Sequence, residues 1–454
     1  MDKIRTLKIG MLGCGVVGQG VVKLLKKHHD DFKRNGFDLK LTQVAVKNLK
    51  KSREVNLHGV LVSDDAVTLA KTADIDILIE VMGGREQALE AGVAALLRGI
   101  PVVSANKASL ARGLSRYMEA AREGHTGLGF ESACAAHIPI IEALDRSLAC
   151  EEISVIKGVV NGTTNYILTL MEVKGWSFAQ ALADATAKGF TEADPSLDVD
   201  GIDAAEKLTL LVFKAFGQYV PPDQIHTEGI SRVTKADMQL SQALNHRIKL
   251  IAGGRVVDGK LNCSVHPALI HRGELLADVD SEFNAIIIEG PNFKELTFLG
   301  KGAGQLPTAS AVLNDVIKFA RGSNTPALPG FVKLPAAPLD QAPTKHLSYC
   351  YFLRLKVLSS GIVDGVVSFL ETQNVKVLSR AFIATDEGEY LGLITDVVKE
   401  SRLSHLMQTL KRVDGVLEDP AFIRLDKDNY REIVELEQRT YFGSSLERQP
   451  GARI

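Results

Sequence analysis

The amino-acid sequence predicts an α/β protein in three parts: a doubly wound parallel sheet, an α+β part with an open sheet, and a ferredoxin-like C-terminal part. The first observation is length, because 454 residues exceed what one ordinary domain core holds. The second is the alternation of strand and helix patterns through the first third of the chain, which favours parallel strands. The third is a βαββαβ order of elements near the C-terminus, the order of ferredoxin-like domains.

The composition narrows the function classes. Lys plus Arg number 53 and Asp plus Glu number 55, so no basic excess indicates a nucleic-acid partner. The five cysteines are far apart and form no CxxC pair, which argues against a disulfide framework or a zinc site and favours a reducing compartment. No signal-peptide pattern opens the chain and no apolar run is long enough to span a bilayer. We therefore expect a cytoplasmic protein without a membrane partner.

The first part comprises residues 1–140, and a helix at residues 305–325 is expected to return to it. Strand and helix patterns take turns along this part, so the strands can lie parallel in one doubly wound sheet. We expect strands at residues 7–13, 39–46, 74–82, 100–105 and 126–132. We expect helices at residues 17–32, 86–99 and 114–124.

The stretch "GMLGCGVVGQG" follows the first expected strand and opens the first expected helix. It contains a GxGxxG pattern at Gly13, Gly15 and Gly18. In this context the first two glycines allow a tight turn and close approach of a pyrophosphate, and the third lets the helix pack on the sheet. The helix N-terminus faces the phosphates. The pattern predicts a Rossmann-type NAD(P)-binding domain, with an ordinary strand–helix turn as the alternative.

The end of the second strand indicates which dinucleotide binds. An acidic residue there would bind the ribose 2′-hydroxyl of NAD. The sequence has "VAVKNLKKSR" instead, and its basic residues cluster where a 2′-phosphate would lie. These residues are Lys47, Lys50, Lys51 and Arg53. The pattern favours NADP over NAD; alternatively, some of these residues form a solvated basic loop.

The segment "SANKASL" follows another strand of the same sheet. Asn106 and Lys107 should therefore lie at the carboxyl edge, where ligands bind in such folds. A lysine at this edge could reach cofactor and substrate together. The alternative is an ordinary surface lysine.

The middle part, residues 141–304, changes to an α+β pattern with an open sheet. We expect strands at residues 152–160, 247–257 and 284–290 and helices at residues 165–175, 177–190 and 202–217. An acidic stretch, "TEADPSLDVDG", separates the last two helices. Its glycine spacing does not fit an EF-hand calcium loop, and no Glu closes it.

A charged pair opens the apolar helix after the acidic stretch. Asp203 and Lys207 are four residues apart, so they share one helix face. A lysine held beside a carboxylate at a partly buried position could act as a positioned acid. The alternative is a structural ion pair at the helix start.

The C-terminal third begins with a Pro- and Ala-rich linker at residues 326–345. Residues 346–430 then form the ferredoxin-like part, and residues 431–454 form a tail. We expect strands at residues 349–357, 375–385, 390–395 and 416–423 and helices at residues 362–372 and 403–412.

Five blocks together resemble one family. "GMLGCGVVG", "SANKA", "VVNGTTNYIL", "GFTEADPSLDVDGIDAAEKL" and "GKGAGQLPTASAV" are similar to the signature blocks of homoserine dehydrogenase, in the same order. The resemblance covers residues 5–322, and the long acidic block is its most specific element. The part after the linker resembles an ACT regulatory domain. The resemblance implies that the middle part is a substrate-binding and dimerisation domain, within a homodimer or homotetramer.

The resemblance also implies an activity and site residues. The activity is the reversible NAD(P)-dependent reduction of L-aspartate 4-semialdehyde to L-homoserine, on the route to threonine and methionine. Lys207 would be the proton donor, with Asp203 beside it and Lys107 between nicotinamide and substrate. The implied substrate-binding residues are Glu192, which would hold the amino group, Asp198, Asn161, Gly162 and Thr163. The cofactor residues are Gly13, Cys14, Gly15, Val16, Val17, Gly18, Lys47, Lys107, Gly302 and Gly304.

The resemblance further implies a monovalent cation, sodium or potassium. Its ligands would be the Glu131 side chain and the carbonyl groups of Cys134, Ala136 and Ile138. This chain has Ala136 and His137 where the family usually has two glycines, and neither residue tolerates a positive φ well. His137 could alternatively approach the nicotinamide.

The C-terminal part departs from the ACT pattern as well. The turn after its first strand reads "VLSSGIVDGV", without the usual Pro, and an effector normally binds that turn. Threonine sensing is one role of this part, and dimerisation alone is another.

Two other function classes compete with the enzyme. One is a catalytically inactive protein that senses NADP or an amino acid on the same scaffold. The other is a dehydrogenase for a different semialdehyde or sugar. Intact Lys107, Glu192, Asp203 and Lys207 speak against the first, and the acidic block, suited to an amino-acid substrate, speaks against the second.

Overall fold

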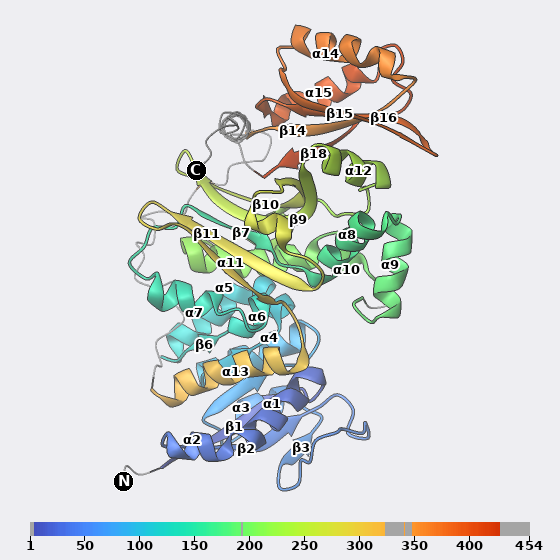
Figure 1. Cartoon of the computed structure of the whole chain (residues 1–454). Coiled ribbons are helices and arrows are strands. Elements are labelled where there is room, and N and C mark those ends of the chain that lie inside the picture. Colours follow the sequence, from blue (N-terminus) through green and yellow to red (C-terminus); the bar gives the residue numbers. More distant parts are fainter. Residues whose placement is uncertain (1–3, 192–193, 323–339, 341–346, 427–454) are drawn as a thin grey trace, which may run out of the picture.

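The computed structural model describes residues 4–191, 194–322, 340 and 347–426. Figure 1 shows an elongated molecule, with the N-terminal sheet at one end, the middle part beside it, and the C-terminal helices and strands at the other end. Glu192, the expected tail at residues 431–454 and all but one residue of the expected linker lie outside the described residues.

The N-terminal sheet has six parallel strands in the order β3-β2-β1-β4-β5-β6. This is the strand order of doubly wound dinucleotide-binding domains, so the predicted fold class is confirmed. The strands are β1 (Arg5–Leu12), β2 (Phe37–Ala45), β3 (Leu61–Ser63), β4 (Ile77–Glu80), β5 (Val102–Ser104) and β6 (Leu128–Gly129). The end predicted for the last of these strands, expected at residues 126–132, was wrong, because helix α6 (Glu131–Ala135) begins before residue 132.

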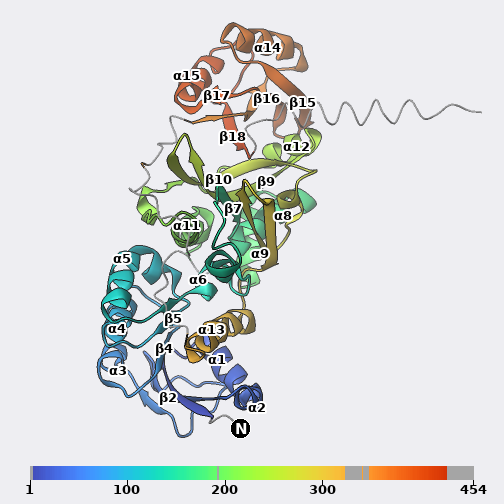
Figure 2. The same ribbon diagram turned by 90° about the vertical axis from the view of Figure 1, so that its left-hand side faces the viewer.

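Helices cover both faces of this sheet, as Figure 2 shows. Against one face lie α3 (Ala66–Thr72), α4 (Glu86–Leu97) and α5 (Lys107–Glu123), and against the other α1 (Val16–Lys27) and α13 (Gln305–Ala320). The short helix α2 (His29–Arg34) follows α1. Helix α13 comes from the far end of the middle part, and its Val312 and Val316 are fully buried with β1 and β4. Burying such side chains stabilises the return of this helix to the first sheet.

The middle part is built around a mixed sheet with β12, β11, β7, β9 and β10 in spatial order. Its strands are β7 (Val155–Val159), β8 (His226–Thr227), β9 (His246–Val257), β10 (Lys260–His271), β11 (Phe283–Gly290) and β12 (Lys294–Lys301). Its helices are α7 (Ile140–Glu142), α8 (Gly162–Lys174), α9 (Phe178–Ala187), α10 (Ser196–Val199), α11 (Ile202–Phe216) and α12 (Lys235–Ala243). Helix α11 is buried on nearly every side, which explains its almost continuous apolar sequence.

The C-terminal part contains β14 (Tyr351–Val357), α14 (Val363–Thr372), β15 (Val377–Thr385), β16 (Gly388–Thr395), α15 (Glu400–Leu410) and β18 (Ala421–Leu425). A short pair, β13 (Ser348–Tyr349) and β17 (Val398–Lys399), lies beside them. The antiparallel order β18-β14-β16-β15 is that of a ferredoxin-like βαββαβ unit. The bounds predicted for the last strand, residues 416–423, were wrong, because β18 spans Ala421–Leu425. Pro420 has no N–H for a ladder, and regular pairing starts after it.

Strand β18 also pairs in parallel with β10, so the C-terminal strands extend the middle sheet. Arg424 lies at this seam and is 2% exposed. Its guanidinium pairs with Glu228, which follows β8, and with Glu400, which opens α15. A buried arginine with carboxylates from both sides ties the two parts together.

Candidate active site

The first helical turns of α11 carry a buried ion pair. Lys207 Nζ lies 2.8 Å from Asp203 Oδ2 and donates to the carbonyl oxygen of Val160 at 2.7 Å. Both residues are only 9% exposed. The helix starts after Gly201, which takes φ 82° and turns the acidic loop into the helix axis. In such surroundings charged groups interact more strongly than in water.

Lys107 brings a second ammonium group to the same carboxylate. It is the first residue of α5, and its Nζ lies 3.0 Å from Asp203 Oδ1. Burial alone raises the pKa of Asp203, but the charges of Lys207 and Lys107 hold that pKa well below its usual value. In turn, the charge of Asp203 raises the pKa of Lys107. Asp203 therefore stays ionised and bridges a lysine of the first sheet domain to a lysine of the middle part.

Asn161 completes the surroundings of Asp203. Its Nδ2 donates to Asp203 Oδ2 at 2.9 Å and to Asp198 Oδ1 at 2.7 Å. Its Oδ1 accepts from the Thr164 backbone N–H and caps α8, which fixes the orientation of the amide. Burial raises the pKa of Asp198. Two carboxylates thus converge on one amide beside Lys207.

The other two residues of this block lie in the first turn of α8, which begins three residues before the helix expected at 165–175. Thr163 donates from its hydroxyl to the carbonyl oxygen of Phe190. This hydrogen bond joins the start of α8 to the chain just before the acidic loop. A side chain at Gly162 would come within 3.0 Å of the carbonyl oxygen of Glu282. Glu192, the expected ligand of the amino group, lies outside the described residues.

The position of Lys107 depends on a buried carboxyl that the sequence analysis missed. Glu80 ends β4, is 0% exposed and accepts from Ser104 Oγ at 2.6 Å. Ser104 Oγ accepts from the backbone N–H of Asn106, and Asn106 caps α5 directly before Lys107. Burial raises the pKa of Glu80 to about 7. A glutamate within the apolar stretch "DILIEVM" was the available signal.

We expect Glu80→Gln to change the pH dependence of stability. Glu80 titrates near pH 7 in the folded chain and near its ordinary value of 4.5 when unfolded, so the folded state holds the extra proton between these values. The contribution of Glu80 to the free energy of unfolding therefore falls as pH rises through this window, by up to about 3 kcal/mol. Urea unfolding at about pH 5 and about pH 7.5 measures the fall.

Glutamine mimics the protonated side chain and removes this titration. Burial also raises the pKa of Asp315 to about 6 and that of Glu131 to about 8, but these groups are present in both proteins and cancel in the comparison. An equal fall in wild type and Glu80→Gln would contradict the prediction.

The three glycines of the GxGxxG turn differ in their surroundings. Gly13 has φ 95°, and a Cβ there would come within 2.6 Å of the Val81 carbonyl oxygen. A Cβ at Gly18 would come within 2.5 Å of the Gly13 carbonyl oxygen, whereas Gly15 has no neighbour within 4 Å. The first and third glycines are therefore needed for packing, and the open backbone at Gly15, before α1, fits a phosphate.

The glycine turn and Lys107 meet at one segment. The backbone of Gly13 packs on Met82, and Asn106 Nδ2 donates to the Met82 carbonyl oxygen at 3.1 Å. Gly304, at the start of α13, has φ 139°, and the next residue, Gln305, donates from Nε2 to the Val16 carbonyl oxygen at 3.0 Å. The start of α13 therefore contacts the glycine turn, and the turn is linked through Met82 to Asn106, the residue before Lys107.

The basic loop after β2 places one arginine against the glycine turn. Burial raises the pKa of the Cys14 thiol, and the neighbouring Arg53 guanidinium opposes that rise. Arg53 donates to the carbonyl oxygens of Lys51 and Asn48, while its Nε is buried with no acceptor among the described residues. Lys47 is exposed. An unsatisfied guanidinium N–H beside an open phosphate turn fits an additional phosphate group.

The residues expected to hold a cation lie around α6. The Glu131 carboxylate accepts the backbone N–H groups of Ile141 and Glu142, at 2.9 and 2.7 Å. Cys134 is buried, and Ala136 takes φ 51° and ψ −104°, a strained angle for a residue with a Cβ. His137 is exposed. No cluster of three or more His, Cys, Asp or Glu side chains suited to a metal occurs in the part of the chain that the structure describes.

Comparisons with known proteins identify relatives over nearly the whole chain. The family model described as "Homoserine dehydrogenase, NAD binding domain" matches residues 13–131, and the model described as "Homoserine dehydrogenase" matches residues 139–317. The homoserine dehydrogenase of Corynebacterium glutamicum is 36% identical over 431 residues, which cover 92% of this chain and 96% of that protein. That of Bacillus subtilis is 32% identical over 438 residues, which cover 94% and 100%.

Solved structures show the same similarity. A homoserine dehydrogenase from Thiobacillus denitrificans has a TM-score of 0.86 at 31% identity, covering 94% of this chain and all of the other. A hyperthermophilic archaeal homoserine dehydrogenase in complex with NADPH has a TM-score of 0.60 at 28% identity, covering 70% of this chain and 98% of the other. The first match includes the C-terminal part, since it covers nearly the whole chain.

Proposed function

The chain belongs to the homoserine dehydrogenase family, and we propose that Lys207 donates the proton when this enzyme reduces L-aspartate 4-semialdehyde to L-homoserine with NAD(P)H. The observation that carries the proposal is the geometry of its ammonium group. Among the described residues, Nζ has two acceptors, Asp203 and the Val160 carbonyl oxygen. A lysine ammonium has three N–H groups, so one remains for the aldehyde oxygen of the substrate.

The chemistry of the reaction requires such a group. The reduced nicotinamide, when bound, supplies the hydride that adds to the aldehyde carbon. Negative charge then develops on the aldehyde oxygen, and an ammonium group aimed at that oxygen stabilises the charge and supplies the proton. Asp203, 2.8 Å from Lys207 Nζ, orients the ammonium group before the transfer. In the reverse direction, the neutral amine of Lys207 takes the proton from the homoserine hydroxyl.

The remaining charged side chains bind and orient the substrate. The amino-acid end of the substrate carries an ammonium group, for which Glu192 and Asp198 supply carboxylates. Asn161 holds the Asp198 carboxylate in place through a hydrogen bond. Lys107 is the more open of the two lysines, with 36% of its side chain exposed, and it is bonded to Asp203. We assign Lys107 to the space between the nicotinamide and the substrate.

The activity is tested with purified protein, homoserine and either NADP⁺ or NAD⁺, by following the absorbance of the reduced cofactor. We expect cofactor reduction that depends on homoserine. Absence of cofactor reduction with both NADP⁺ and NAD⁺ would rule out this activity.

For the cofactor, we propose a preference for NADP. An exposed Lys47, a half-buried Arg53 with an unsatisfied Nε, and the open turn at Gly15 support this proposal. We expect Arg53→Ala to raise KM for NADP⁺ by about tenfold, because one charge-assisted hydrogen bond to the 2′-phosphate is lost. KM for NAD⁺, which lacks that phosphate, should change less than about twofold.

Steady-state kinetics with both cofactors measure this difference. Lys40→Ala is the matched control, because Lys40 is an exposed basic residue of β2 that pairs with Asp38, away from the glycine turn. Equal loss of affinity for NADP⁺ and NAD⁺ in Arg53→Ala would contradict a contact with the 2′-phosphate.

We further propose, from the family resemblance, that sodium or potassium binds between Glu131 and the carbonyl groups of Cys134, Ala136 and Ile138. The positive φ of Ala136 supports a specialised loop there. We also propose that the C-terminal part is an ACT domain; its ferredoxin-like strand order supports this. A homodimer or homotetramer is the expected assembly.

None of the described helices is both long and apolar enough to cross a bilayer. All five cysteines are free, which supports a reducing compartment, and we propose the cytoplasm.

A further inference from the structure

The carbonyl oxygen of Val160 accepts a second hydrogen bond besides that of Lys207. Asn284 Nδ2 donates to it at 3.0 Å, and Lys207 Nζ donates at 2.7 Å. Asn284 lies in β11, one residue before Ala285, which pairs with Val159 of β7. We propose that Asn284 is a positioning residue for Lys207: it holds the Val160 carbonyl where the proton donor needs it. This inference rests on the proposed role of Lys207.

The Asn284 amide contributes through its N–H donor and not through its oxygen. Asn284 is 0% exposed, and its Oδ1 is buried without a partner among the described residues. An unsatisfied buried oxygen is unfavourable, and an apolar residue of the same shape would avoid it. Turning the amide over would place its oxygen against the Val160 carbonyl oxygen, which is repulsive. The hydrogen bond to Val160 is therefore what the amide contributes.

The loop before α13, which carries Gly302, packs directly on this amide. A Cβ at Gly302 would come within 2.0 Å of Asn284 Nδ2 and 2.4 Å of its Oδ1. The loop continues into α13, where Gln305 donates to the Val16 carbonyl oxygen next to the glycine turn. Asn284 therefore lies between the loop that carries the expected cofactor residues Gly302 and Gly304 and the carbonyl oxygen that accepts from Lys207.

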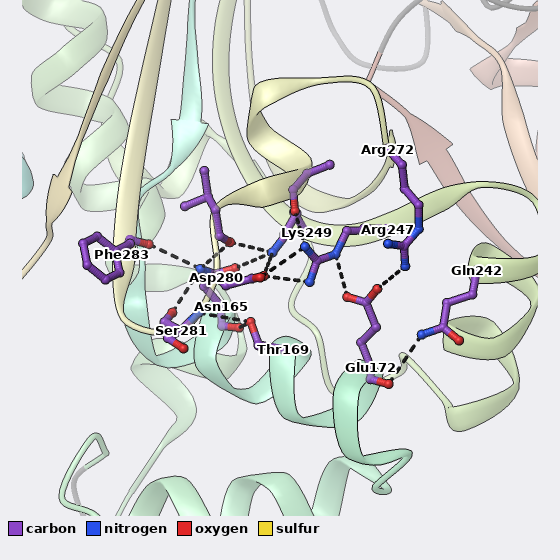
Figure 3. Close-up of polar contacts among 12 residues, drawn as sticks. Asn165, Thr169, Glu172, Gln242, Arg247, Lys249, Arg272, Asp280, Ser281 and Phe283 are labelled. Carbon is purple, nitrogen blue, oxygen red and sulfur yellow. Dashed lines mark hydrogen bonds and ion pairs between the residues drawn. The ribbon is translucent and has the colours of Figure 1, made fainter. Parts of the chain in front are cut away.

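A buried polar network anchors the segment that leads into Asn284, as Figure 3 shows. Asn165 Nδ2 donates to the carbonyl oxygens of Val279, Ser281 and Phe283, at 2.9, 3.0 and 3.3 Å. Lys249, which is 1% exposed, donates to Asn165 Oδ1 at 3.2 Å and to the Val279 carbonyl oxygen at 2.6 Å. The chain directly before Asn284 is thus fixed at three carbonyl groups.

Ion pairs hold this network in turn. Arg247 Nε lies 2.7 Å from Glu172 on α8, and Arg247 Nη2 lies 2.7 Å from Asp280. Figure 3 shows these side chains converging from β9, α8 and the loop before β11. The start of β11 is held on several sides. We therefore expect a change of the Asn284 side chain to move the Val160 carbonyl group and to leave the backbone of β11 in place.

The test is Asn284→Leu in a double-mutant cycle with Lys207→Ala. We expect Asn284→Leu to lower kcat by about 10- to 100-fold with KM for homoserine and NADP⁺ within about threefold, since one hydrogen bond that orients the donor is lost. In the Lys207→Ala background the same change should alter kcat less than about twofold, because the group it positions is gone. A purely structural role would give a similar loss in both backgrounds.

Asn262→Leu is the matched control, because Asn262 is a buried asparagine of the same sheet, on β10, away from Val160. Its kcat should stay within about threefold of wild type. If Asn284→Leu does not yield folded protein, Asn284→Ser is subjected to the same cycle. An unchanged kcat in Asn284→Leu, or equal losses in both backgrounds, would overturn the inference. Full turnover in Lys207→Ala alone would instead refute the proposed function.

Discussion

Lys207→Ala is expected to lower kcat by about a thousandfold in both directions, because the ammonium group that protonates the aldehyde oxygen is lost. KM for NADP⁺ should change less than about threefold, since the polar partners of Lys207 among the described residues are Asp203 and the Val160 carbonyl oxygen, not the glycine turn. Steady-state kinetics with homoserine and NADP⁺ measure the loss. Lys207→Arg should not restore the rate, because a guanidinium group does not release its proton in this pH range.

Lys214→Ala is the matched control for this loss. Lys214 lies two turns further along α11, its side chain is fully buried, and its Nζ lies 2.7 Å from Asp145 Oδ1. Its replacement also removes a buried lysine from its ion pair, so it should lower stability, but kcat should remain within about threefold. Full turnover in folded Lys207→Ala would show that another group donates the proton.

Asp203→Asn is expected to lower kcat/KM for homoserine by about 100- to 1,000-fold and the free energy of unfolding by about 3 kcal/mol. The carboxylate bonds both Lys207 and Lys107, and its removal leaves a buried and a half-buried ammonium group near each other without this counter-charge. Kinetics and chemical unfolding measure the two effects separately.

The stability effect should depend on pH with a defined sign. The charges of Lys207 and Lys107 hold the pKa of Asp203 below its ordinary value of 3.8 in the folded chain. The ionised form thus stabilises the fold above that ordinary value, and the stabilisation is lost as pH falls toward the folded-state pKa. The difference in stability between wild type and Asp203→Asn should shrink on acidification below about pH 4.

Asp145→Asn provides the control for the second variant. It removes the carboxylate partner of Lys214, a buried lysine of the same helix, and should lower stability without a comparable loss of kcat/KM. If both variants lost activity to the same degree, the effect of Asp203→Asn would be one of stability alone.

Local patterns predicted the elements that hold the site. The GxGxxG spacing predicted the strand–turn–helix at Gly13 to Gly18, because Gly13 takes a positive φ and Gly18 lies too close to the Gly13 carbonyl oxygen for a Cβ. The four-residue spacing of Asp203 and Lys207 predicted a shared helix face, and the two side chains form an ion pair. Both predictions depend on backbone geometry within one or two turns, which the residues themselves decide.

Element ends were predicted less well. Helix α5 begins at Lys107, seven residues before the helix expected at 114–124, because Asn106 caps it. The last strand starts after Pro420 and pairs with β10 of the middle part as well as with β14. A cap and a pairing partner depend on the three-dimensional surroundings of a residue, which periodicity does not describe.

The sequence by itself determined the doubly wound first sheet, the βαββαβ order of the C-terminal part, and the pairing of Asp203 with Lys207. Only the tertiary structure decided that Lys107 reaches the same carboxylate, that Glu80 supports the cap before Lys107, and that Asn284 and Lys207 share one carbonyl oxygen. The physical reason is distance along the chain. Local contacts follow from backbone geometry over a few residues, whereas these groups are joined by the contact between α5 and α11 and by strand pairing, of β4 with β5 and of β7 with β11.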